Sequence, residues 1–174
     1  ERELADILAE EGLIKDGFIA IVMGSPADLP HAEKMKNIIE QYDIACDMRI
    51  ISAHKNGENI IDLARDYNYA IEALAVIAVA GRSNGLGGAL AANLSVPVIN
   101  CPPFSDKTDM MININSSLMM PSNTPAATVV DAGNAVYFTL RALNLHRLKD
   151  TFSTEIAATK TKLFFADEEI RTIK

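Results

Sequence analysis

Apolar runs of strand length alternate with amphipathic stretches along this chain. Five runs have the length of a strand, at residues 18–23, 44–51, 73–80, 96–100 and 126–130. The first and third are apolar throughout, which is typical of strands buried on both faces of a parallel sheet. The second contains Asp47 and Arg49, so we expect it nearer an edge of the sheet.

Helical patterns separate these runs. After the first run, Ser25, Pro26 and Asp28 have the residue types of a helix start. The buried face of that helix is expected to contain Ala32, Met35, Ile39 and Tyr42. The next helix is expected at 58–67, with its apolar positions at Ile61, Leu63, Ala64 and Tyr67.

Further helices are expected at 89–94, at 131–145 with Asp131 as its cap, and from 149 to the end. Residues 106–117 are a polar, Met-rich connection with room for a short helix. Alternating strands and helices predict an α/β fold. We expect a three-layer α/β/α architecture, a flavodoxin-like parallel sheet with an extra C-terminal helix.

The same pattern divides the chain into three parts. Residues 1–16 have the spacing of a short amphipathic helix, which we interpret as a linker or the tail of an upstream domain. Residues 17–150 are expected to form the sheet domain, and residues 151–174 the final helix. Because the chain begins at Glu1, we expect it to be a piece of a longer polypeptide.

A glycine-rich segment follows the third apolar run, from Ala78 to Gly88. It has the pattern Gly-x-x-x-Gly-x-Gly-Gly and leads into a helix. Glycines let backbone N–H groups approach a ligand, and a helix N-terminus favours an anion. Arg82, Ser83 and Asn84 add a cation, a hydroxyl and an amide. The spacing is neither the dinucleotide fingerprint nor the P-loop, so a plain βα loop with a solvated Arg is the alternative.

Polar residues also follow the other runs. In a parallel sheet the carboxyl ends of the strands share one edge, and ligands bind there. That edge is expected to gather four loops: Gly24, Ser25 and Asp28; Ser52, His54 and Lys55; Gly81 to Asn84; and Cys101 to Pro103. We therefore predict one binding site at this edge.

Phosphate and sugar are the ligands that these residue types favour. Lys55 and Arg82 supply cations, and Ser25 and Ser83 supply hydroxyl donors. Asp28 can accept from ribose hydroxyls, or it is a plain acid at a helix start.

Proton transfer is the chemistry that the remaining residues favour. His54 is the candidate proton carrier, because imidazole titrates near neutrality. The alternative is a structural or solvated histidine, the interpretation we give to His31 and His146. Cys101 has no obvious base beside it, so we interpret it as a buried thiol.

Composition excludes several classes of function. The chain has 174 residues, enough for one domain with a core. Its net charge is −7 and it has no local basic patch, which argues against nucleic acid. The two cysteines and three histidines are scattered, so no metal site is indicated. The apolar runs are too short to cross a bilayer, and neither a signal peptide nor a Walker motif is found. Free cysteines favour a reducing, cytoplasmic compartment.

Five motifs occur in order along the chain: MGSPAD at 23–28, SAHK at 52–55, VAGRSNGLGG at 79–88, PVINCPP at 97–103 and SSLMMPS at 116–122. Together they resemble the phosphoribosylaminoimidazole (AIR) carboxylase family, the PurE-type family of purine biosynthesis. SAHK and GRSNGLG resemble the class II branch, which carboxylates AIR directly with CO2. The class I branch, a mutase of N5-carboxy-AIR, usually carries SAHR and a GAGGAAHLPG loop.

The resemblance implies a role for each site residue. His54 would carry the proton and Ser83 would share the catalytic centre. Ser83, Asn84 and Gly85 would lie around the CO2 or carboxylate. The other substrate-binding residues would be Gly24, Ser25, Asp28, Ser52, Ala53, Lys55, Gly81 and Arg82.

The resemblance also implies cofactors and partners. The family uses no ATP, biotin or metal, and CO2 is a co-substrate. It forms homo-octamers in which the last helix reaches a neighbouring subunit. In animals the domain is fused to SAICAR (succinylaminoimidazolecarboxamide ribonucleotide) synthetase.

Three positions depart from the family pattern, which usually has Ser at Ala27, Arg at Met119 and Gly at Asn123. These departures bear on substrate affinity more than on the class of reaction. Three other functions stay open: the class I mutase, a relative that carboxylates another ring such as a pyridinium nucleotide, and a catalytically silent assembly module.

Overall fold

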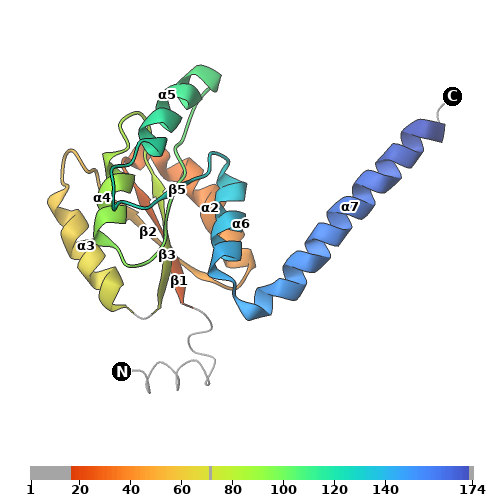
Figure 1. Cartoon of the computed structure of the whole chain (residues 1–174), viewed down its shortest axis with the longest axis horizontal. Coiled ribbons are helices and arrows are strands. Elements are labelled where there is room, and N and C mark those ends of the chain that lie inside the picture. Colours follow the sequence, from red (N-terminus) through yellow and green to blue (C-terminus); the bar gives the residue numbers. More distant parts are fainter. Residues whose placement is uncertain (1–16, 71, 173–174) are drawn as a thin grey trace, which may run out of the picture. The chain divides into compact units, whose positions relative to one another are not determined.

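The five expected strands form one parallel sheet. The computed structural model describes residues 17–70 and 72–172, so the helix expected at 1–16 lies outside the described residues. The strands are β1 (Phe18–Met23), β2 (Ala45–Ile50), β3 (Ala73–Val79), β4 (Val98–Asn100) and β5 (Ala127–Thr128). Their order is β2-β1-β3-β4-β5, the flavodoxin-like order, and β2 lies at an edge as expected (Figure 1).

The register of the strands brings their carboxyl ends level with one another. Met23, the last residue of β1, pairs with Ile50 of β2 on one side and with Val79 of β3 on the other. Asn100, the last residue of β4, pairs with Ala78. The loops after these strands therefore leave the sheet along one edge.

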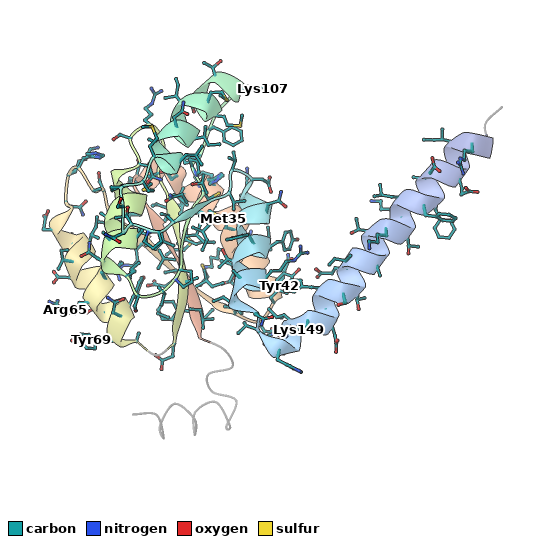
Figure 2. All side chains as sticks on the ribbon, viewed as in Figure 1. Met35, Tyr42, Arg65, Tyr69, Lys107 and Lys149 are labelled. Carbon is teal, nitrogen blue, oxygen red and sulfur yellow. The ribbon has the colours of Figure 1, made fainter. Side chains whose placement is uncertain are left out.

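Helices cover both faces of the sheet (Figure 1). One face carries α2 (Leu29–Gln41) and α6 (Ala132–Leu143), and the other carries α3 (Glu58–Tyr69) and α4 (Gly85–Asn93). The side chains of Ala32, Met35, Ile39 and Tyr42 are buried, as expected. Figure 2 shows Met35 among the side chains between α2 and the sheet. The three-layer α/β/α prediction is confirmed.

Two helices differ from the sequence-based expectation. In α3 the buried positions begin at Ile60, whereas Ile61 is 55% exposed. Residues 60, 63, 64 and 67 have the spacing of one helical face, and Ile61 lies off it. Helix α4 begins at Gly85, four residues earlier than expected, because the Asn84 side chain caps it by accepting from the Gly87 N–H at 2.9 Å.

The turn after β1 and the Met-rich connection also take defined forms. Ser25 caps a short 3-10 turn, η1 (Pro26–Asp28), which leads into α2. Residues 107–118 form a complete helix, α5 (Lys107–Leu118). Asp106 caps it by accepting from the backbone N–H groups of Thr108 and Asp109. Figure 2 marks Lys107 at its start.

The chain divides into two compact units, and the second begins within α6, at Leu140. This second unit continues through η2 (His146–Leu148) into α7 (Lys149–Thr172). The domain boundary expected after residue 150 stays a prediction. The Arg141 guanidinium lies 5.3 Å from the centre of the Phe152 ring. Helix α7 leaves large apolar side chains exposed, at Leu163, Phe164, Phe165 and Ile170. In the part of the chain described, no helix has both the length and the apolar character needed to cross a membrane.

Candidate functional site

An open cavity of about 580 Å³ lies at the carboxyl edge of the sheet. The loops after β1, β2, β3 and β4 contribute to its lining, and so does α5. The lining residues are Gly24, Ser25, Asp28, Ser52, Ala53, His54, Ala80, Gly81, Arg82, Ser83, Leu86, Pro103, Phe104, Ser105, Asp109 and Asn113. Loops far apart in the sequence thus meet at one site, as the parallel topology requires.

An imidazole and a hydroxyl face each other across this cavity. The His54 Nε2 atom lies 3.5 Å from the Ser83 Oγ atom, and both residues are exposed. The imidazole also packs on Gly85, where an added Cβ would lie 3.1 Å from His54 Cε1. Because glycine has no side chain, the imidazole ring has room to lie against it, and the imidazole stays open to a ligand.

The glycine-rich turn is held from beneath by polar side chains. Arg82 has a positive φ of 46°, a conformation that is unfavourable for residues with a Cβ. Its backbone N–H donates to Asn113 Oδ1 at 2.6 Å. Asn84 is 5% exposed, and its Nδ2 donates to Ser117 Oγ at 3.0 Å. The side chain of Asn84 therefore stabilises the turn and does not line the cavity.

The charged side chains of the cavity have both signs. Arg82 Nη2 lies 3.9 Å from Asp109 Oδ1, and the arginine side chain is 80% exposed. Such a solvated pair is weak, so the guanidinium is available to an anion. Burial raises the pKa of Asp28, an effect partly opposed by a hydrogen bond to the Ser25 backbone.

Asp28→Asn is expected to raise the melting temperature near pH 7. The folded-state pKa of Asp28 lies above the unfolded value, so its ionised form costs stability above the unfolded pKa. The gain should disappear below about pH 3, where the carboxyl is protonated in both states. Thermal unfolding across this pH range measures it, with the exposed Asp66→Asn as control. An equal gain in both variants would contradict the assigned cause.

Most of the predicted site residues come together. Nine of them line the cavity: Gly24, Ser25, Asp28, Ser52, Ala53, His54, Gly81, Arg82 and Ser83. Lys55, Asn84 and Gly85 do not belong to the lining. Lys55 is an exposed residue beside His54, whereas Asn84 and Gly85 act through the contacts given above.

Sequence reasoning missed the contribution of α5 and of the residues before it. Phe104, Ser105, Asp109 and Asn113 line the cavity without having been expected there, whereas Pro103 belongs to a loop that was expected at this edge. A signal existed, because Asp106, Asp109 and Asn113 recur at helical spacing and mark one polar face. The amide at 113 had no distinguishing motif around it.

Cys101 has a base beside it, which corrects the sequence-based expectation. His31 Nε2 lies 3.4 Å from Cys101 Sγ, although 70 positions separate the two residues. The thiol is fully buried, and burial, with the nearby Asp131 carboxylate, raises its pKa to about 12. The pair therefore stabilises the fold as a neutral contact, and the thiol is a poor nucleophile.

Cys101 is expected to resist alkylation in the folded protein. In a Cys46→Ser variant, iodoacetamide at about pH 8 should modify Cys101 about 10³-fold more slowly than in denaturant, because the thiolate is suppressed by the raised pKa. Mass spectrometry of timed samples measures the rate. Comparable rates in the folded and denatured states would contradict the buried, neutral thiol.

Among the described residues, no group of histidine, cysteine and acidic side chains is arranged to hold a metal ion. The cavity lining contains an imidazole, a guanidinium, serine hydroxyls and carboxylates, which are groups able to bind a phosphorylated sugar and to move a proton.

A family model described as AIR carboxylase matches residues 18–163, which include every residue of the cavity. The chain belongs to the AIR carboxylase family. The family resemblance expected from the ordered motifs is thereby confirmed.

Individual AIR carboxylase relatives agree with this assignment. The chain is 36% identical to phosphoribosylaminoimidazole carboxylase of Archaeoglobus fulgidus, over 87% of this chain and 83% of the relative. It is 33% identical to the Drosophila melanogaster bifunctional phosphoribosylaminoimidazole carboxylase/phosphoribosylaminoimidazole succinocarboxamide synthetase, over 99% of this chain. It spans only 39% of that bifunctional relative. The crystal structure of Treponema denticola PurE superposes with a TM-score of 0.80 at 31% identity, covering 88% of this chain and 98% of that one.

The three departures from the usual AIR carboxylase pattern lie outside the cavity lining. Asn123 has a positive φ of 61°, a conformation that glycine adopts freely and asparagine tolerates. Met119 is 82% exposed, and Ala27 donates its backbone N–H to Ser25 Oγ. None of the three substitutions removes a side chain from the cavity wall.

Proposed function

We propose that this chain carboxylates 5-aminoimidazole ribonucleotide (AIR) with CO2 to give 4-carboxy-5-aminoimidazole ribonucleotide. The observation that carries the proposal is the exposed His54 imidazole, held over Gly85 and 3.5 Å from Ser83 Oγ in an open cavity. Two relatives named phosphoribosylaminoimidazole carboxylase, of which the chain covers 83% and 98%, support the choice of substrate.

The reaction needs one bond-forming step and one proton transfer. The ring carbon C4 of AIR is enamine-like, and its electron pair attacks the carbon of CO2. One C–O π bond of CO2 breaks and its electrons form the carboxylate. His54 then accepts the C4 proton, and the C–H electrons restore the aromatic ring. The proposal assigns the enzyme to the carboxy-lyases, working without ATP, biotin or a metal.

Cavity residues are suited to hold the rest of the nucleotide. We assign the phosphate to Arg82, which lines the cavity, and to Lys55, an exposed cation beside His54 that lies outside the lining. The hydroxyl of Ser25 adds a donor, and Asp28 accepts from the ribose hydroxyls. An anionic phosphate beside Arg82 would replace the weak contact to Asp109.

Direct carboxylation is preferred to the class I mutase reaction because this chain has Lys55 after His54 and no histidine in its glycine-rich loop. The test supplies the protein with AIR and bicarbonate/CO2, or with N5-carboxy-AIR, and follows carboxy-AIR by absorbance. We expect product from AIR and CO2. Product from N5-carboxy-AIR alone would establish the mutase. Failure to bind AIR would favour a different ring as substrate.

Assembly into a homo-octamer is proposed from α7. Leu163, Phe164, Phe165 and Ile170 are exposed on this helix, which suits a helix that packs on a neighbouring subunit. Light scattering should give eight times the chain mass, and charged substitutions at Phe164 and Phe165 should lower it. A monomer at micromolar concentration would contradict the octamer. A fused SAICAR synthetase belongs to the same proposal and is supported by the bifunctional relatives. A cytoplasmic location is proposed from the free cysteines, Cys46 and Cys101.

A further inference from the structure

Helix α5 places buried polar side chains directly under the glycine-rich turn. Asn113 is 3% exposed and Ser117 is 1% exposed. Burial of amide and hydroxyl groups is costly unless they are hydrogen-bonded, so their partners show what the helix holds in place.

The Asn113 side chain joins two loops that line the cavity. Its Oδ1 accepts from the backbone N–H of Arg82 at 2.6 Å. Its Nδ2 donates to the backbone carbonyl of Pro103 at 2.7 Å. The same amide packs on Gly81, where an added Cβ would lie 3.3 Å from Nδ2. One side chain therefore fixes the distance between the glycine-rich turn and the loop after β4.

The other end of the turn is held from the same helix. Ser116 Oγ accepts from the backbone N–H of Asn84 at 3.2 Å. Ser117 Oγ accepts from the Asn84 side chain at 3.0 Å. Ser83 thus lies between two residues whose backbone N–H groups donate to α5. The position of its hydroxyl relative to His54 depends on these contacts.

We propose that Asn113 is a positioning residue for the reaction at His54. Its Oδ1 stabilises the left-handed backbone of Arg82 and so sets Ser83 at its place opposite the imidazole. The inference rests on the proposed function only for its kinetic consequence. Its structural part, that Asn113 holds the turn, stands on the hydrogen bonds alone.

The test compares Asn113→Ala with Asn113→Asp and with Asn115→Ala. Asn113→Asp keeps the acceptor for the Arg82 N–H and loses the donor to Pro103. Asn115 lies on the same helix and is exposed, with its side-chain amide donating to Met111 in the preceding turn, so Asn115→Ala is the matched control. Thermal unfolding first verifies that each variant folds.

Amide exchange, measured by NMR without substrate, tests whether Asn113 holds the glycine-rich turn. In Asn113→Ala the Arg82 amide should exchange about tenfold faster than in Asn115→Ala, the factor expected for loss of one hydrogen bond. In Asn113→Asp the exchange rate of the Arg82 amide should stay close to the wild-type value.

Kinetics with AIR and CO2 test whether Asn113 affects the reaction at His54. Asn113→Ala should lower kcat about 10²-fold with little change in KM, because a misplaced turn affects the transition state more than binding. Asn113→Asp should recover part of that loss. A rise in KM at constant kcat, or no difference between the two substitutions, would overturn the positioning role. An Arg82 amide that exchanges equally in Asn113→Ala and Asn115→Ala would overturn it as well. Failure of the wild-type protein to use AIR would instead overturn the proposed function.

Discussion

His54→Asn is expected to lower kcat for AIR carboxylation by about 10²–10⁴-fold, the usual contribution of a general base. Asparagine has a similar size and keeps a polar side chain, but it cannot accept a proton at neutral pH. Since His54 is exposed at the cavity, its replacement leaves no buried group unsatisfied. The melting temperature and the oligomeric state should therefore stay unchanged.

The matched control is His146→Asn, which changes an exposed histidine in the second unit. It should leave kcat and KM at their wild-type values. If His54→Asn also retains its kcat, another group carries the proton, or the chain serves as an assembly module without catalysis of its own.

Gly87→Ala is expected to lower the free energy of unfolding by about 2–3 kcal/mol, the cost of overpacking a close contact. A Cβ at Gly87 would lie 1.9 Å from Asn100 Oδ1, a buried atom for which the described residues provide no hydrogen-bond partner. Asn100 cannot withdraw freely, because its Nδ2 donates to the Ser117 carbonyl at 3.3 Å. Either α4 or β4 must shift.

Gly88→Ala is the matched control, one position further along the same helix. Its Cβ would meet only Met120 Sδ, at 3.4 Å, which is an ordinary contact with a flexible side chain. Here the helix propensity of alanine dominates, and we expect a gain of up to about 1 kcal/mol. Chemical denaturation of both variants measures the two free energies. Changes of the same sign would contradict the close packing of Gly87 on Asn100.

The fold could be predicted because the apolar pattern of this chain is unambiguous. Buried runs such as 18–23 and 73–80 permit few arrangements other than a parallel sheet, and its topology places the loops after the strands at one edge. Ser25, His54, Arg82 and Ser83 therefore come together without any knowledge of side-chain contacts.

What could not be predicted is how each polar side chain is used. An asparagine after a glycine-rich turn can face a ligand or cap a helix, and only packing decided that Asn84 caps α4. Cys101, the residue after β4, meets His31 in the first turn of α2, a contact that their spacing in the sequence does not reveal. The cavity wall from α5 was missed because no motif surrounds Asp109 and Asn113, and helical spacing of polar residues does not by itself indicate a ligand site.

A crystal structure of this protein with AIR tests the account most directly. We predict AIR in the cavity at the carboxyl edge of the sheet, with the ring carbon C4 facing His54 Nε2 and the phosphate beside Arg82. The nucleotide bound elsewhere, or C4 turned away from the imidazole with another base beside it, would contradict the account.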